Sequence, residues 1–282
     1  MQPDELALAF RCEDDTLYGV LSAPAAPAAR GVLIVVGGPQ YRAGSHRQFT
    51  LLARALARQG IPAMRFDYRG MGDSSGAPRN FEAVQADLRA AVDQFYAASP
   101  GLQEVVLWGL CDAASASLFY ARHDPRVRGL VLLNPWVRTA QGEAKATLKH
   151  YYRQRLLAPE LWRKLLRGRF DYRAAWQSLR RVLAGARSKP ASGDGDGDGA
   201  SLPQRMLAGW QGFAGPILLI TSGNDLTARE FLDLGQDDPH WRACLAAARV
   251  QRQSLAEADH TFSRAAWRAQ VEDWTAAWLR DW

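Results

Sequence analysis

The sequence has little of what marks a secreted or membrane protein. Only three cysteines occur among 282 residues, at positions 12, 111 and 244, and they form neither a metal-binding spacing nor an even disulfide set. No run of about 18 apolar residues is present, and the opening MQPDELALAFRCEDD lacks a basic stretch followed by an apolar one. We therefore expect no transmembrane segment and no signal peptide, and a location in the reducing cytoplasm.

Motifs for phosphates, dinucleotides and metals are also missing. The glycine-rich stretch RGMGDSSG (69–76) has no helix starting inside it, so it does not fit a dinucleotide fingerprint. Asp194, Asp196 and Asp198 imitate the start of a calcium loop, but the twelfth position is Arg205 where a bidentate glutamate is needed. We expect no metal and no cofactor, and a solvated linker near residues 188–202.

Negative charge is scarce in one segment. The formal net charge is +6, but residues 138–189 alone hold fourteen Lys or Arg against three acids, so the rest of the chain is negative. This segment suits an anionic substrate or partner, and equally it suits helices whose charges are simply solvated. Its aromatics, such as Tyr151 and Trp162, sit at helical core spacing, so we expect no nucleic acid as a partner.

Strand-like and helix-like segments alternate through most of the chain. An antiparallel opening pair is followed by apolar, β-branched runs of the kind that buried parallel strands need. The predicted strands are 6–12, 16–24, 31–36, 61–70, 104–109, 127–136, 216–223 and 249–255; the predicted helices are 45–60, 80–99, 113–123, 237–248 and 263–279. This order predicts an α/β fold with a mostly parallel central sheet and helices on both faces.

The alternation breaks after Pro135, and about eighty residues intervene before the next strand, too many for an ordinary connection. Much of this stretch has helical periodicity. We predict a core of residues 1–135 and 213–282 and a helical cap of residues 136–212, inserted after the sixth strand.

The stretch WGLCDAAS (108–115) lies between a predicted strand and a predicted helix. Small residues two positions on either side of Cys111, Gly109 and Ala113, allow a sharp turn with the thiol at its apex, an arrangement typical of the nucleophile elbow of α/β-hydrolases. Most such enzymes carry serine there. The following helix N-terminus favours a thiolate, and the Asp112 N–H is placed to donate to an oxyanion. The Asp112 carboxylate would oppose this if it pointed inward, and we expect it to cap the helix instead.

Two further residues complete a predicted Cys-His-Asp triad. Asp225 follows the strand 216–223 and His260 follows the strand 249–255, which is the chain order, nucleophile then acid then base, of this fold. Taken singly, each has an ordinary interpretation as a helix cap or a solvated loop residue. Asp259 is an alternative partner of the imidazole, but it is adjacent in sequence and would reach the ring awkwardly, so Asp225 is preferred.

The loop after the strand 31–36 should supply the second oxyanion donor. Pro39 has no N–H, which leaves Gly38 or Gln40, with Gln40 preferred. His46 and Arg42 are candidates for substrate binding, although packing at the start of the next helix explains them as well. Arg138, the first residue of the basic segment, is a further candidate for substrate binding.

Five stretches together, GGPQYRAGSHRQF, RFDYRGMGDSSG, WGLCDAAS, LVLLNPWVRT and ADHTFS, resemble the α/β-hydrolases called exosortase A system-associated hydrolase 1. The resemblance spans nearly the whole chain, apart from the aspartate-glycine linker. It implies the α/β-hydrolase fold and an association with exopolysaccharide production and protein sorting in Gram-negative bacteria. It does not imply a substrate.

These patterns predict a cysteine-dependent hydrolase that acts on an ester or thioester through an acyl-thioenzyme on Cys111. The expected partner is a small-molecule or carrier-bound acyl substrate. Two alternatives stay open: an acyltransferase that uses the same site, and a non-catalytic partner protein of an exopolysaccharide or sorting complex that has kept the hydrolase scaffold.

Overall fold

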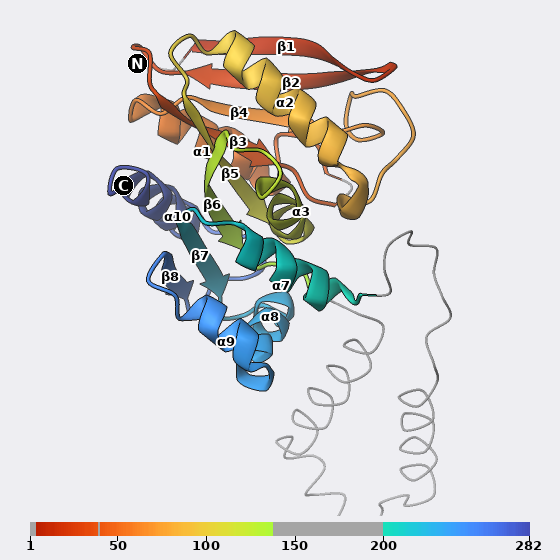
Figure 1. Cartoon of the computed structure of the whole chain (residues 1–282). Coiled ribbons are helices and arrows are strands. Elements are labelled where there is room, and N and C mark those ends of the chain that lie inside the picture. Colours follow the sequence, from red (N-terminus) through yellow and green to blue (C-terminus); the bar gives the residue numbers. More distant parts are fainter. Residues whose placement is uncertain (1–3, 39, 138–199) are drawn as a thin grey trace, which may run out of the picture. The chain divides into compact units, whose positions relative to one another are not determined.

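The computed structural model describes residues 4–38, 40–137 and 200–282 (Figure 1). The chain divides into two compact units, Met1–Val137 with Gln204–Trp282, and Arg138–Pro203. The predicted linker and most of the predicted cap lie outside the described residues. The cap and the domain boundaries therefore stay predictions.

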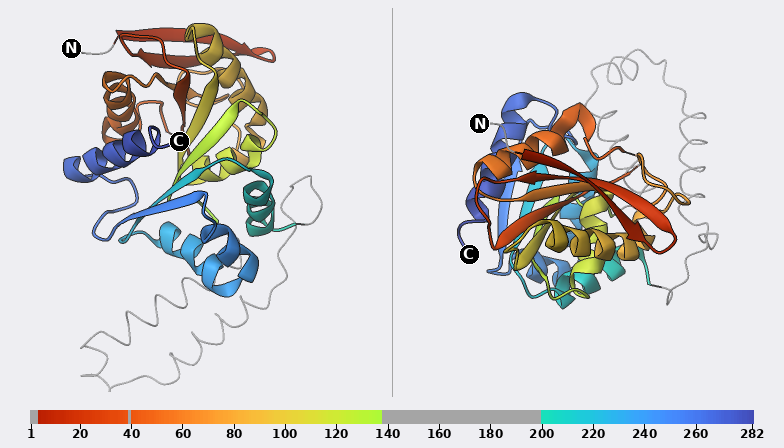
Figure 2. Two further views of the ribbon diagram at one scale, coloured as in Figure 1. Left: turned by 60° about the vertical axis from the view of Figure 1, so that its left-hand side comes forward. Right: turned by 90° about the horizontal axis from the view of Figure 1, so that it is seen from above.

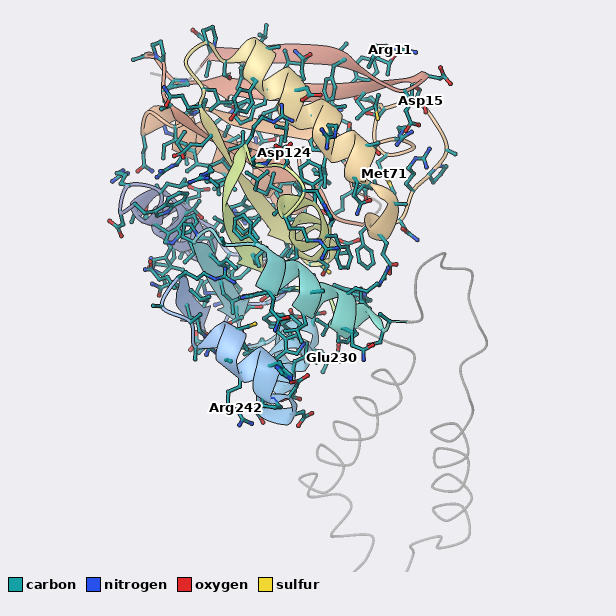
Figure 3. The ribbon with its side chains drawn as sticks, viewed as in Figure 1. Arg11, Asp15, Met71, Asp124, Glu230 and Arg242 are labelled. Carbon is teal, nitrogen blue, oxygen red and sulfur yellow. The ribbon has the colours of Figure 1, made fainter. Side chains whose placement is uncertain are left out.

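An eight-stranded sheet forms the centre of the first unit, in the order β1-β2-β4-β3-β5-β6-β7-β8 (Figure 1). β1 pairs antiparallel with β2, β2 pairs antiparallel with β4, and the remaining neighbours are parallel. The strands are β1 Asp4–Cys12, β2 Asp15–Ala23, β3 Arg30–Val35, β4 Ala63–Asp67, β5 Glu104–Leu110, β6 Val127–Leu133, β7 Ile217–Ser222 and β8 Val250–Leu255. The predicted mostly parallel sheet is confirmed, including its antiparallel opening hairpin, which carries Arg11 and Asp15 near its turn (Figure 3).

Helices cover both faces of the sheet (Figure 2). One face carries α1 and α10, which contact each other, and the opposite face carries α2 and α3. The helices are α1 Gln48–Arg58, α2 Gln85–Ala98, α3 Asp112–Ala121, α7 Leu202–Gly212, α8 Leu226–Asp237, α9 Pro239–Leu245 and α10 Ala265–Trp278, with short 3-10 turns at Ser45–Arg47 and Phe81–Ala83. None of the helices in the described ranges is long and apolar enough to cross a membrane.

Two helices begin later than predicted, and one helix was not predicted. The helix expected from Ser45 begins at Gln48, because His46 and Arg47 have left-handed φ angles of 54° and 59° that interrupt it. The helix expected from residue 80 begins at Gln85, after a 3-10 turn that the Asn80 side chain caps. α8 was not predicted at all.

The core lies on both sides of the central parallel strands. Under α1 and α10, side chains of β3, β5, β6 and β7 form one apolar cluster, in which the Phe49 and Trp108 rings meet edge to face with 5.7 Å between centroids. On the other side Trp210, Phe231 and Trp241 form a buried aromatic group that joins α7, α8 and α9. Because the parallel strands all end at one edge of the sheet, the loops that follow β3, β5, β6, β7 and β8 gather there.

Candidate active site

The turn between β5 and α3 holds Cys111 alone, with φ 65° and ψ −125°. A non-glycine residue in such a conformation is strained, and strain of this kind gathers at functional sites. Gly109 is required because a Cβ there would lie 2.6 Å from the backbone carbon of Ala113. The end of β6 also holds the turn, since Cys111 N donates to Leu133 O at 2.9 Å and Trp136 N donates to Cys111 O at 3.1 Å. The thiol is partly exposed.

His260 and Asp225 meet beside this turn. His260 Nδ1 lies 2.9 Å from Asp225 Oδ2, and the Cys111 side chain is near enough to the imidazole to raise its pKa. The hydrogen bond to Asp225 and then the Cys111 side chain outweigh burial and raise the pKa of His260 from 6.5 to about 10. The raised pKa favours the protonated imidazole at neutral pH.

Asp225 has two tasks. Its side chain is 8% exposed, and besides contacting the imidazole it accepts hydrogen bonds from Thr227 N at 3.2 Å and Ala228 N at 3.1 Å as the N-cap of α8. These bonds fix the carboxylate in one orientation toward His260. The alternative partner, Asp259, instead accepts hydrogen bonds from the backbone and hydroxyl of Ser263.

Asn134, which follows β6, is a site residue that sequence reasoning missed. It is fully buried, with a left-handed φ of 41°. Its Nδ2 donates to Ser222 Oγ at 2.8 Å and to the backbone carbonyl of His260 at 3.1 Å, and its Oδ1 accepts from Ser222 N at 2.9 Å. The amide thus joins the ends of β6 and β7 to the loop that carries the imidazole. Asparagine before proline at the end of a buried strand is the signal that could have revealed it.

The three predicted oxyanion donors lie at the same edge of the sheet. Gly38 N donates to Asp112 Oδ2 at 2.8 Å, and Gln40 N donates to the Gly38 carbonyl at 2.8 Å. The N–H groups of Ala113 and of Asp112 itself lower the pKa of this carboxylate. α3 has no side-chain cap hydrogen bond, and the Asp112 carboxylate, expected to cap it, instead accepts from Gly38 N in the loop after β3. The N–H groups of Gly38 and Gln40 therefore both have acceptors within the chain.

The predicted substrate-binding residues have different surroundings. Arg42 is paired with two aspartates of the chain. Its backbone N donates to Asp67 Oδ1 at 2.6 Å, and its guanidinium contacts the carboxylates of Asp67 and Asp73. His46 is exposed on the 3-10 turn before α1. Arg138 lies outside the described residues. Across the described part of the chain, no group of three His, Cys, Asp or Glu side chains is placed to hold a metal ion.

Comparisons with known proteins agree with this architecture. A family model described as serine aminopeptidase, S33, matches residues 27–181, more than half of the chain. A polyketide transferase, grgF, of a Penicillium species is 29% identical over 94 residues, which cover 30% of this chain and only 31% of that protein.

Solved hydrolases share the fold at low sequence identity. Esterase Pf2001 of Pyrococcus furiosus is similar over 99% of this chain and 92% of its own, with a TM-score of 0.67 and 14% identity. A dienelactone hydrolase of Anabaena variabilis is similar over 99% of this chain and 98% of its own, with a TM-score of 0.62 and 15% identity. Est1E of Butyrivibrio proteoclasticus, solved with ferulic acid, is similar over 97% of this chain and 98% of its own, with a TM-score of 0.61 and 13% identity. The chain has the α/β-hydrolase fold and belongs to the hydrolase family described as serine aminopeptidase, S33.

Proposed function

We propose that the chain is a cysteine-dependent hydrolase that acts on an ester or thioester through an acyl-thioenzyme on Cys111. The observation that carries this proposal is the pairing of His260 with Asp225 at 2.9 Å beside the elbow turn of Cys111, whose side chain raises the pKa of the imidazole. A thiolate is the reactive form of cysteine, and a cation hydrogen-bonded to the sulfur favours it. The elbow turn supports the same conclusion, because the residue at its apex, Cys111, is partly exposed.

The reaction would proceed in two halves. In the first, the Cys111 sulfur attacks the acyl carbon; a carbon–sulfur bond forms, the bond to the leaving oxygen or sulfur breaks, and the leaving group takes the proton held on His260. In the second, His260 removes a proton from water as the water oxygen attacks the thioester. The carboxylic acid leaves, and the proton returns to the thiol and imidazole pair. Asp225 would keep Nδ1 protonated, so that Nε2 faces the reacting atoms.

An acyltransferase is the second candidate, favoured by the partial likeness to a polyketide transferase. The first half-reaction would be unchanged, and an acceptor hydroxyl, amine or carbon nucleophile would replace water in the second. Thioesters suit this reaction well, because thiolate attack on a thioester exchanges one sulfur for another with little change in energy.

The resemblance to the exosortase A system-associated hydrolases supports a cytoplasmic role beside exopolysaccharide production, and the surplus of basic residues in 138–189 supports an anionic acyl donor. A non-catalytic scaffold role predicts that Cys111 can be replaced without consequence. Replacing Cys111 by alanine and measuring exopolysaccharide output therefore separates chemistry from assembly.

A direct test is intact-mass analysis of the purified chain after incubation with p-nitrophenyl acetate and with acetyl thioesters. An acyl adduct on Cys111 is expected, together with loss of turnover after full alkylation by iodoacetamide. Cys244→Ala is the matched control, because Cys244 is also a partly buried free thiol but lies on α9, away from the imidazole. Turnover that survives complete alkylation of Cys111, or adducts only on Cys244, would remove the mechanism.

A further inference from the structure

The carbonyl oxygen of an acyl group becomes an anion while sulfur is bonded to its carbon, and preorganised N–H groups stabilise that anion. On a nucleophile elbow these donors come from the residue after the nucleophile and from the loop after β3. In this chain they are the N–H groups of Asp112 and Gly38. An inference about them rests on the proposed function, since it concerns the same reaction at Cys111.

One of these groups already has an acceptor. Gly38 N donates to Asp112 Oδ2 at 2.8 Å, and the N–H groups of Ala113 and of Asp112 also lower the pKa of that carboxylate. The neighbouring backbone offers no replacement, since Gln40 N donates to the Gly38 carbonyl and Pro39 has no N–H. The Asp112 carboxylate thus receives the Gly38 N–H hydrogen bond that a substrate oxyanion would need.

The surroundings of this carboxylate are fitted to it. A Cβ on Gly37 would lie 2.1 Å from Asp112 Oδ1, so only glycine leaves room for the side chain. The buried Tyr68 hydroxyl donates to the Gly38 carbonyl at 3.4 Å and holds the loop from the other side. Burial raises the pKa of Asp112 even though the hydrogen bond from Gly38 and the charge of His260 lower it. The surrounding residues therefore leave space for the Asp112 carboxylate and hold the Gly38 loop beside it.

We propose that the Asp112 side chain is a built-in occupant of the oxyanion site, and that acyl transfer to Cys111 requires it to swing out and release the N–H group of Gly38. Two anions cannot share that donor, so a substrate must supply binding energy to displace the first. Small acyl donors have nothing but the reacting carbonyl to offer. Asp112 is therefore a specificity-determining residue that selects donors with a large non-reacting portion, such as carrier-linked or nucleotide-linked acyl groups.

The test compares two reactions of Cys111 that differ in one respect. Acylation by p-nitrophenyl acetate passes through an oxyanion, whereas alkylation by iodoacetamide does not. The rate constants of both are measured for the wild type, Asp112→Ser, Asp112→Asn and the control Asp14→Ser, which removes an exposed carboxylate of the β1–β2 turn. Serine vacates the site, while asparagine keeps an oxygen that can accept from Gly38 N–H without the negative charge. Circular dichroism confirms folding.

Since one oxyanion donor is worth about 10²–10³ in rate, the ratio of acylation to alkylation should rise roughly tenfold or more in Asp112→Ser. It should rise less in Asp112→Asn and stay unchanged in Asp14→Ser. An unchanged or lower ratio in a folded Asp112→Ser overturns the inference, and if that variant does not fold, an unchanged or lower ratio in Asp112→Asn does so. Wild-type acylation on Cys111 in the same experiment leaves the proposed function standing, whereas its absence from every variant, with alkylation intact, overturns both.

Discussion

Asn134→Ala tests whether the Asn134 side chain holds the loop that carries His260 in place. It removes an amide whose donor and acceptor atoms both have partners, and it leaves the Ser222 N–H, the Ser222 hydroxyl and the His260 carbonyl without theirs. Each buried polar group that loses its partner costs about 1–3 kcal/mol. The hydroxyl can rotate toward another acceptor, and the two backbone groups cannot, so we expect a loss of about 3 kcal/mol in the free energy of unfolding.

Urea denaturation measures that loss, and the rate of Cys111 alkylation by iodoacetamide measures whether the imidazole has moved from the sulfur. Asn80→Ala is the matched control, because Asn80 is exposed and its side chain accepts one hydrogen bond, from Glu82 N at 3.0 Å. Loss of such a cap costs about 1 kcal/mol. If Asn134→Ala loses no more stability than Asn80→Ala, or unfolds more readily while alkylation stays at the wild-type rate, Asn134 does not position His260.

Three further outcomes are expected from the same contacts. The raised pKa of His260 stabilises the fold below pH 6.5, and this contribution is lost as pH rises through about 10. Asp225→Asn should therefore flatten the decline in unfolding free energy between these two pH values. It should also bring the pKa of the imidazole, measured by NMR, back toward 6.5. Burial raises the pKa of Asp124 (Figure 3), but hydrogen bonds from Arg126 and Tyr120 lower it to about 2. The stability that this carboxylate contributes is present above pH 3.8 and is lost as pH falls toward 2. Asp124→Asn should therefore have a lower free energy of unfolding at pH 7 and lose less of it on acidification. Gly109→Ala forces a methyl group against the Ala113 backbone and should destabilise the fold by about 1–3 kcal/mol in thermal denaturation, with slower alkylation of Cys111.

The sheet could be predicted because its evidence is local. Apolar, β-branched runs separated by amphipathic segments require parallel strands with helices on both faces, and the structure has them. The helices were harder where one residue changes the backbone. His46 and Arg47 adopt left-handed angles that no periodicity reveals, so α1 begins three residues later than its apparent cap.

Some residues of the candidate site also have a local sequence signal, and others have none. Asp225 and His260 could be proposed because the fold fixes the chain order of such residues, and each follows a recognisable strand. The helix α8 was missed because the helix-cap and imidazole-partner interpretations of Asp225 were weighed as alternatives, whereas its carboxylate fills both roles. Contacts between distant segments have no local signal: Gly38 and Asp112 are separated by 74 residues, and Asn134 and His260 by 126.

A cysteine at position 111 and a carboxylate in the oxyanion site are physically compatible in a way that serine would not be. Serine becomes an anion only as it attacks, so that reaction creates charge that the oxyanion site must stabilise at once. In the proposed mechanism, a thiolate beside a protonated imidazole would already carry the charge, and attack would transfer it from sulfur to oxygen. The reaction therefore depends less on free N–H donors, and the chain can keep Asp112 against Gly38 until a substrate binds strongly enough to displace it. On this reasoning the departure from serine and the acid beside it are one adaptation, in which an activated nucleophile is combined with a site that small acyl donors open less readily than large ones.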